Sequence, residues 1–314
     1  INQTAGEPAR RLPGRKRNMR DFNELLSRVQ SGRKKTVALV AAEDEHALQA
    51  LIAARDLVGS VLVGDAEKIR AALRALEQDP ADYEIVQNKE GEHPAVCAAK
   101  LIGAGRADFL MKGKIMTSDL LKGVLSPDAG LRTGRLMSHV SLNQIRGYHK
   151  LLSITDGGMC PYPNLEQKKQ ILANALELFH GLGCEKPKVG VLCAVEAVNP
   201  KMIETQDAEQ LRRLYESGEL GGCVLEGPVS YDIAIYPEIA EYKGYRGVCS
   251  GDFDILLVPN LVTGNALGKC LVYTVGGEMA GLIMGAKVPI VLTSRASSAK
   301  EKYLSLALAA GICS

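Results

Sequence analysis

The segment from Val288 to Arg295 reads V-P-I-V-L-T-S-R and ends in two side chains that could do chemistry. A strand-like apolar run delivers the hydroxyl of Ser294 and the guanidinium of Arg295 at its carboxyl end, where α/β enzymes place their active sites. The hydroxyl can donate or accept a hydrogen bond, and the guanidinium can hold two oxygens of a phosphate or carboxylate at once. The pair predicts an oxyanion site. A strand that ends in a surface turn with a solvated arginine explains the same residues equally well.

Two other segments place polar groups next to strand-like runs. Residues 259–269 read P-N-L-V-T-G-N-A-L-G-K and directly follow an apolar run, so a Thr-Gly-Asn turn and a lysine should lie beyond a strand end. Residues 227–234 read G-P-V-S-Y-D-I-A. The substrate-binding candidates of the first segment are Thr263, Gly264, Asn265 and Lys269.

A cationic cluster follows the predicted strand 108–111. Lys112 and Lys114 come directly after it, and the segment Thr117–Asp119 can cap a helix that leads to Lys122. A strand end that faces a helix N-terminus favours anions. We therefore expect Lys112, Lys114, Thr117 and Lys122 to bind an anionic substrate, while an ordinary loop with solvated lysines is the alternative.

The elements that must position these groups alternate between apolar strands and helices, which indicates a parallel sheet covered on both faces. The pattern predicts strands at 36–42, 60–64, 83–87, 108–111, 151–155, 188–195, 223–226, 255–258 and 288–292. It predicts helices at 44–57, 67–77, 93–103, 117–124, 165–179, 207–217, 265–275 and 298–310, after a first amphipathic helix that opens near Met19.

Several familiar signatures are absent from the sequence. Gly103-Ala104-Gly105 follows a helix, the reverse of a dinucleotide-binding turn, and favours a helix C-cap. The run from Gly264 to Lys269 has three residues between its glycines where a P-loop needs four, and Cys270 replaces the required Ser or Thr. No G-x-S-x-G elbow occurs. The five histidines are scattered, at 46, 93, 139, 149 and 180. The sequence therefore argues against ATP hydrolysis and against a histidine-based nucleophilic triad.

Composition sets the class of protein. The chain has 314 residues, of which 46% are hydrophobic and 24% charged, enough for a large core and two domains. A net charge of +2 gives no reason to expect nucleic-acid or membrane partners. The eight cysteines form no C-x-x-C pair, which predicts buried free thiols and no metal site. We expect residues 1–18 to be a disordered leader outside the fold, and the protein to be cytoplasmic.

The three motifs resemble those of the phosphate acetyltransferase and phosphate butyryltransferase family. That family carries G-P-x-x-[FY]-D-x-A, then P-x-L-x-T-G-N, and then a C-terminal S-R. The resemblance covers most of residues 100–314, with the motifs in the family's order and near its spacing. The segments T-S-R-A and M-K-G-K-I-M-T and the short chain look more like the butyryl branch.

The resemblance implies roles for individual residues. Arg295 matches the family's phosphate-binding arginine, and Ser294 matches the serine that hydrogen-bonds the thioester or its tetrahedral oxyanion. Glu301 stands six positions after Arg295, where the acetyl branch has an aspartate that acts as base for the thiol. A glutamate can do the same proton transfer, but an exposed helix glutamate is an equally good explanation.

Two departures from the acetyl branch concern coenzyme A. Lys122 falls about where that branch has an arginine that helps to bind coenzyme A. Tyr273 stands near the position of a second such arginine, so the anion must be bound from elsewhere, and Lys269 is the candidate.

The implied fold has two doubly wound α/β domains with an interdomain cleft, similar to isocitrate and isopropylmalate dehydrogenases. The first domain would contain residues 19–137 and 296–314, and the second residues 138–295. The implied activity transfers a butyryl or similar short acyl group between coenzyme A and inorganic phosphate. The phosphate would attack directly in a ternary complex, with no permanently bound cofactor and with a homodimer or higher oligomer as the working form.

Other functions stay open. Acetyl transfer is one, because chain-length preference depends on pocket volume. A dehydrogenase of the same fold would need a metal-binding aspartate cluster, and the sequence offers only dispersed aspartates such as Asp232, Asp252 and Asp254. A non-catalytic regulator that binds an acyl metabolite or a protein would not need Ser294 and Arg295.

Overall fold

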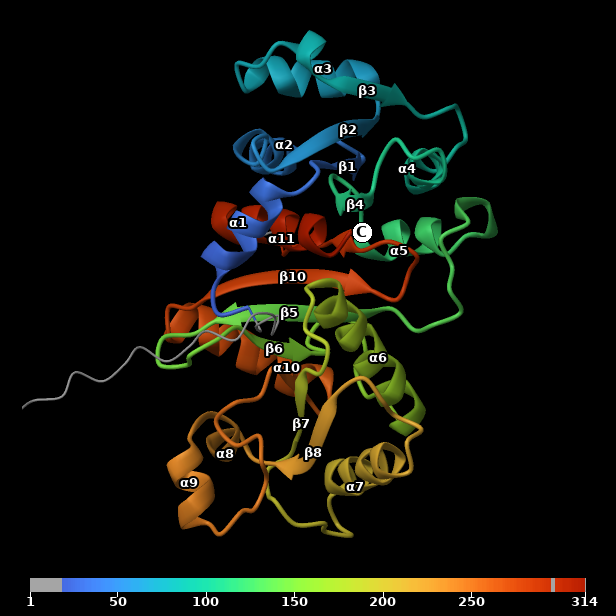
Figure 1. Ribbon diagram of the computed structural model, residues 1–314. Helices are drawn as coiled ribbons and strands as arrows, with labels where there is room; N and C mark the ends of the chain where they lie inside the picture. The colour runs from blue at the N-terminus through green and yellow to red at the C-terminus, as the bar shows by residue number, and fades with distance from the viewer. Residues whose placement is uncertain (1–18, 295–296, 314) are drawn as a thin grey trace, which may run out of the picture.

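One long β-sheet runs through the molecule. The computed structural model describes residues 19–294 and 297–313, and the sheet they form has eleven strands in the order β3-β2-β1-β4-β11-β10-β5-β6-β9-β7-β8. Figure 1 shows β3 at one end of the molecule, β7 and β8 toward the other, and β10 and β5 across the middle. The strands are β1 (Lys35–Val40), β2 (Val58–Gly64), β3 (Glu84–Gln87), β4 (Phe109–Lys112), β5 (Ser138–Gln144), β6 (Leu152–Thr155), β7 (Lys188–Leu192), β8 (Val224–Val229), β9 (Ile255–Leu257), β10 (Glu278–Met284) and β11 (Ile290–Val291).

The sheet has two parallel halves joined by an antiparallel centre. Strands β3, β2, β1, β4 and β11 are parallel to one another, and so are β6, β9, β7 and β8. The pairs β11–β10, β10–β5 and β5–β6 are antiparallel. The predicted α/β class with parallel strands is therefore confirmed for both halves. The two central strands, β5 and β10, were not predicted.

Helices cover both faces of the sheet. One face carries a continuous apolar core under α1 (Phe22–Ser31), α2 (Glu45–Ala53), α3 (Ala66–Ala75), α6 (Leu165–Gly181), α7 (Ile203–Glu216) and α11 (Ala299–Ile312). On the other face, α4 (Pro94–Gly103) and α5 (Thr117–Val124) cover the first half of the sheet. The second half is covered there by α8 (Tyr231–Ile235), α9 (Pro237–Tyr242) and α10 (Leu261–Lys269), which a π-helical turn (Cys270–Thr274) extends. On this second face, the central strands β5 and β10 lie between these two separate cores.

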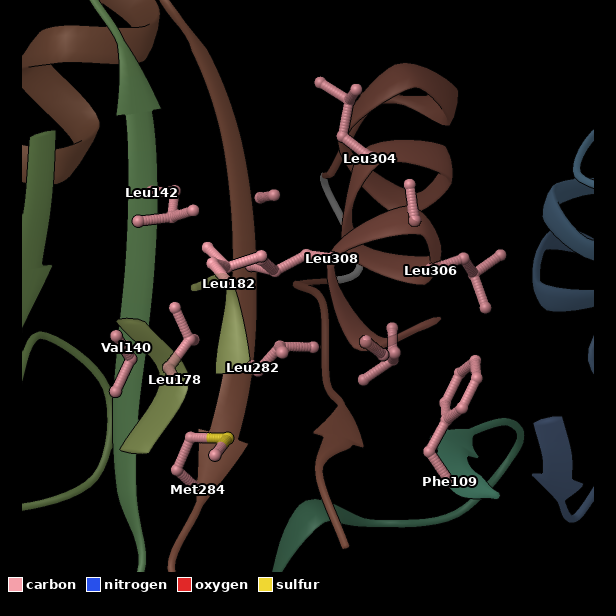
Figure 2. Packing of buried hydrophobic residues seen from close by; sticks show 14 of the residues in the cluster. Phe109, Val140, Leu142, Leu178, Leu182, Leu282, Met284, Leu304, Leu306 and Leu308 are labelled. Atoms are coloured by element: carbon pink, nitrogen blue, oxygen red, sulfur yellow. The ribbon is translucent and has the colours of Figure 1, made fainter. Parts of the chain in front are cut away.

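The last helix reaches the centre of the sheet because β11 is short. Among the described residues, β11 pairs with only Leu282 and Ile283 of β10. Beside the rest of β10 lies α11, where Ser305 Oγ accepts the Gly281 N–H at 3.0 Å. Figure 2 shows α11 between Leu282 of β10 on one side and Phe109 of β4 on the other. The first turn of α11 is thereby held next to the central strands.

Side-chain caps fix where several helices begin. Asp44, Asp65 and Ser298 each accept a backbone N–H from the first turn of α2, α3 and α11. The capping predicted for the segment Thr117–Asp119 is wrong. Thr117 is already the first residue of α5, which begins after Met116 without a side-chain cap.

The predicted Thr-Gly-Asn turn is also wrong, because α10 begins four residues earlier than expected. Asn260 accepts the N–H of Thr263 at 3.0 Å and caps the helix at Leu261. Residues 263–265 therefore lie in the first turns of α10. The Gly264–Lys269 run is helical, which agrees with the prediction that it is no phosphate-binding loop.

The sheet continues through the predicted domain boundary. Strands β5, β10 and β11 of the predicted second domain lie side by side in the sheet, and β11 pairs directly with β4 of the first domain. The division into two domains stays a prediction. The predicted leader, residues 1–18, lies outside the described residues.

The remaining composition-based predictions concern cysteines and membranes. All eight cysteines are free thiols, and six of them are buried, while Cys270 is exposed and Cys313 is partly buried. No helix within residues 19–294 and 297–313 has the length and apolar character needed to cross a bilayer.

Candidate active site

A cavity of about 210 Å³ lies over the central strands, in the space between the two helix groups. It brings together five residues that the sequence singled out, from two distant parts of the chain: Ser294, Glu301, Gly264, Asn265 and Lys269. Strands β5 and β10 form the floor, α10 forms one wall, and Leu292, Ser294, Ser297 and the first turn of α11 form the opposite wall.

The α10 wall depends on a contact between two glycines. A Cβ on Gly264 would lie 2.8 Å from the Gly157 Cα and 2.9 Å from the Asp156 carbonyl oxygen, so no larger side chain fits there without a shift. Asn265 holds the same loop, since its Nδ2 donates to the Gly157 carbonyl at 3.1 Å. The two residues of the Thr-Gly-Asn motif thus dock α10 onto the end of β6.

A buried carboxylate fixes that loop from within. Asp156 accepts the N–H groups of Gly158, Met159 and Cys160 at 2.7, 2.9 and 3.1 Å. Burial raises the pKa of the neighbouring Cys160 thiol to about 12, so the sulfur stays protonated. The loop is a rigid rim of the cavity, and Cys160 is no nucleophile at neutral pH.

Glu301 enters the cavity from the third position of α11. The helix has the S-x-x-E pattern of a capping box, and Ser298 Oγ accepts the Glu301 N–H at 3.1 Å. The carboxylate, however, accepts a hydrogen bond from Ser297 Oγ at 2.6 Å. Burial raises the pKa of Glu301 above its ordinary value, so the carboxyl group holds its proton to a higher pH than a solvated glutamate does.

His139 is the cavity residue that the sequence reasoning missed. It lies on β5 opposite Ile283 of β10, and its ring fits between two glycines. A Cβ on Gly158 would lie 3.0 Å from the His139 Cβ, and a Cβ on Gly281 would lie 2.6 Å from the His139 Nε2. Burial lowers the pKa of His139, and the charge of Asp156 opposes that shift only in part. The imidazole is therefore neutral at physiological pH.

Apolar side chains complete the floor of the cavity. Ile154, Met279, Ile283 and Leu292 all line it. Met279 and Ile283 are on β10, and Leu292 is the residue after β11. The cavity thus has an apolar floor beneath a rim of hydroxyl, carboxyl, amide and amine groups.

A second cavity of about 510 Å³ adjoins the first, and Ser294 lines both. Lys112, Lys114 and Lys302 surround it, together with His46. Gly113 brings the lysines here because the end of β4 touches the end of β1: a Cβ on Gly113 would lie 2.2 Å from the Ala41 carbonyl oxygen.

The remaining predicted residues lie elsewhere. Lys122 is exposed and forms an ion pair with Asp119 at 3.7 Å, and neither it nor Thr117 lines these two cavities. Thr263 faces a third cavity on the other side of α10, where its Oγ1 donates to Asn260. Arg295 lies outside the described residues. Within those residues, no group of three or more His, Cys, Asp or Glu is arranged to hold a metal ion.

Comparisons with known proteins agree with the motifs. The family model described as "Phosphate acetyl/butaryl transferase" matches residues 88–310. The chain is 40% identical to the phosphate butyryltransferase of Clostridium acetobutylicum, over 93% of this chain and 98% of that protein. It is 38% identical to the phosphate acetyltransferase of Thermotoga maritima, over 92% and 99%.

Solved structures show the same architecture. A branched-chain phosphotransacylase from Enterococcus faecalis superposes with a TM-score of 0.76 and 29% identity, over 88% of this chain and 99% of that one. A 4-hydroxythreonine-4-phosphate dehydrogenase from Klebsiella pneumoniae shares the fold, with a TM-score of 0.55 at 11% identity, over 90% and 100%. The predicted likeness to dehydrogenase folds is confirmed. The chain belongs to the phosphate acetyl/butyryl transferase family and is a phosphate acyltransferase.

Proposed function

We propose that this phosphate acyltransferase is a phosphate butyryltransferase, which converts butyryl-CoA and inorganic phosphate to butyryl phosphate and coenzyme A. The observation that carries the proposal is the pair of joined cavities. One offers an apolar floor for a short acyl chain, and the other offers lysines for a polyanionic carrier, with Ser294 where they meet.

The cationic cavity suits the nucleotide part of coenzyme A. The ammonium groups of Lys112, Lys114 and Lys302 would bind its phosphates, each as a point charge. The pantetheine arm then leads past Ser294 into the smaller cavity, and the acyl chain lies against Ile283 and Met279. Arg295, one residue further along, would hold the attacking phosphate by two parallel hydrogen bonds.

The reaction is a direct displacement at the thioester carbon. An oxygen of the hydrogen phosphate dianion forms the new C–O bond, the carbonyl oxygen becomes an oxyanion, and the C–S bond then breaks. Protonated Glu301 gives its proton to the departing thiolate, and the proton lost by phosphate restores it. Ser294 donates to the oxyanion, and a donor in that role contributes about 3–4 kcal/mol to the lowering of the barrier.

The other residues of the site shape the cavity around the substrates. Lys269 and Asn265 on α10 lie across the cavity from Ser294, where they limit the volume open to water. Burial raises the pKa of Cys160, Cys184 and Cys193 to about 12 each, which argues against these three thiols as nucleophiles that form an acyl-enzyme.

Steady-state kinetics tests the proposal. Initial rates of thiol release are measured while butyryl-CoA and phosphate are varied together, and direct attack predicts intersecting lines in the double-reciprocal plot. Parallel lines, or labelled butyryl groups that stay on the denatured protein after incubation without phosphate, would contradict the ternary complex. Failure to release thiol from any short acyl-CoA in the presence of phosphate would contradict the proposed function.

A further inference from the structure

His139 occupies a position in the site that its packing alone does not explain. Within the described part of the chain its Nδ1 is buried and has no hydrogen-bond partner. Its ring leaves no room for a side chain at Gly158, in the loop after β6, or at Gly281 of β10, because a Cβ at either position would be tight against His139. A buried polar group without a partner destabilises a fold, so a merely structural role would favour an apolar side chain here.

The register of the central strands shows where the ring lies. His139 is opposite Ile283, and residues directly opposite share one face of the sheet, which here is the cavity face. A Cβ on Gly281, two residues along β10 from Ile283, would lie 2.6 Å from Nε2. The ring therefore lies across β10, above Gly281.

That position is next to the two residues proposed to act in the reaction, Ser294 and Glu301. The N–H of Gly281 donates to Ser305 Oγ, which in turn donates to the Glu301 carbonyl at 2.7 Å. Ser294 and Glu301 line the same cavity as His139. Nδ1 is enclosed by protein, so Nε2 is the nitrogen that a substrate can reach.

We propose that His139 is a second hydrogen-bond donor to the acyl carbonyl: its neutral imidazole carries the proton on Nε2 and donates it to the thioester oxygen, and more strongly to the oxyanion. This inference rests on the proposed function and names a further catalytic residue for it. A neutral donor suits a carbonyl that becomes charged only during the reaction, because the hydrogen bond then strengthens as the charge develops.

Four proteins test the proposal: the full-length wild type, His139→Leu, His139→Gln and the control His180→Leu. Gln keeps an N–H near the position of Nε2 but cannot transfer a proton as imidazole does. His180 lies on α6 and does not line the cavity, and its Nε2 is 2.9 Å from the Gly222 carbonyl oxygen. We expect His139→Leu to lower kcat about 10²- to 10³-fold with little change in either KM. His139→Gln should regain at least tenfold of the lost kcat, and His180→Leu should stay within about threefold of the wild type.

A binding measurement separates donation from a structural role. Two unreactive coenzyme A analogues are compared, in which a methylene replaces the thioester sulfur: the ketone, and its counterpart without the carbonyl. One hydrogen bond predicts that the wild type binds the ketone about 2- to 12-fold more tightly. His139→Leu should lose this preference and His139→Gln should keep it. If His139→Leu is not folded, Gly281→Ala replaces it, because the added methyl group would displace Nε2.

The proposal is overturned if His139→Leu keeps its kcat, if Gln is as inactive as Leu, or if the ketone preference survives the loss of the imidazole. These outcomes all require an active wild type, so they are distinct from failure of the proposed function, in which the wild type itself releases no thiol. If acetyl-CoA proves to be the better substrate, the same comparison is made with the acetyl analogues.

Discussion

The apolar floor of the cavity predicts how the enzyme discriminates between acyl chains. Butyryl exceeds acetyl by two methylene groups, and each buried methylene contributes about 0.8 kcal/mol. If both lie against Met279, Ile283 and Leu292, the transition state gains about 1.6 kcal/mol, which raises kcat/KM for butyryl-CoA about 15-fold over acetyl-CoA.

Shortening Met279 should move this preference to longer chains. Met279 is half-buried on the floor of the cavity, and Met279→Ala removes three heavy atoms from it. The space accommodates roughly two more methylenes, so the ratio of kcat/KM for hexanoyl-CoA to that for butyryl-CoA should rise up to about 15-fold. The absolute rate with butyryl-CoA should fall, because part of the cavity is then unfilled.

The assay is phosphate-dependent thiol release with acetyl-, butyryl- and hexanoyl-CoA at saturating phosphate. Met116→Ala is the matched control, since it removes the same side chain from the lysine-lined cavity and should affect all three chain lengths equally. An unchanged hexanoyl-to-butyryl ratio in Met279→Ala would mean that the acyl chain lies elsewhere. A wild type that prefers acetyl-CoA would refute the butyryl assignment and leave the family membership intact.

Three further substitutions test the rest of the site. Burial raises the pKa of Glu301, so the folded state loses stability as the pH rises above the ordinary value of 4.5. Glu301→Gln should therefore raise Tm at about pH 8, and the difference in Tm between variant and wild type should shrink toward pH 4. The same substitution should lower kcat. An equal or lower Tm at the higher pH would show that the carboxylate is well solvated. Arg295→Lys keeps the charge but not the planar fork, so calorimetry and kinetics should show weaker phosphate binding and a lower kcat, and unchanged phosphate kinetics would remove Arg295 from the site. Gly264→Ala forces a methyl group to 2.8 Å from Gly157 and should cost about 1–3 kcal/mol in urea unfolding, unless the loop after β6 moves freely.

The sequence predicted the parallel halves of the sheet because their signals are local. Continuous apolar runs such as T-V-A-L-V identify buried strands, and the helices between them have their own periodicity. The positions where helices begin depend on single residues, which hydrophobic periodicity does not reveal. Asn260 moved the start of α10 to Leu261, and Met116 rather than Thr117 precedes α5.

The central strands carried a weaker signal. In S-H-V-S-L-N-Q, Val140 and Leu142 alternate with His139, Ser141 and Asn143, a period of two that indicates a strand with one apolar face. The residues of the opposite face are largely enclosed as well. Ser141 and Asn143 form hydrogen bonds there, and His139 and Ser141 line the cavity. His139 could have been found by asking which polar residues share that face. Its neighbours Gly158 and Gly281 could not, because their proximity depends on strand pairings far apart in the chain.

The rule that α/β enzymes work at the carboxyl ends of parallel strands located Ser294 but not the shape of the site. Because β10 and β5 run antiparallel between the two halves, the carboxyl ends of β11 and β6 point in opposite directions. The groups that follow them, Ser294 and the loop at Gly157, therefore approach the cavity from opposite ends of the same sheet face. A substrate that reaches from one to the other lies along β5 and β10, over His139 and Met279. The antiparallel centre thus turns two separate strand-end sites into one cavity, and this explains why the proposed donor His139 and the proposed specificity residue Met279 lie on strands that carry no recognisable motif.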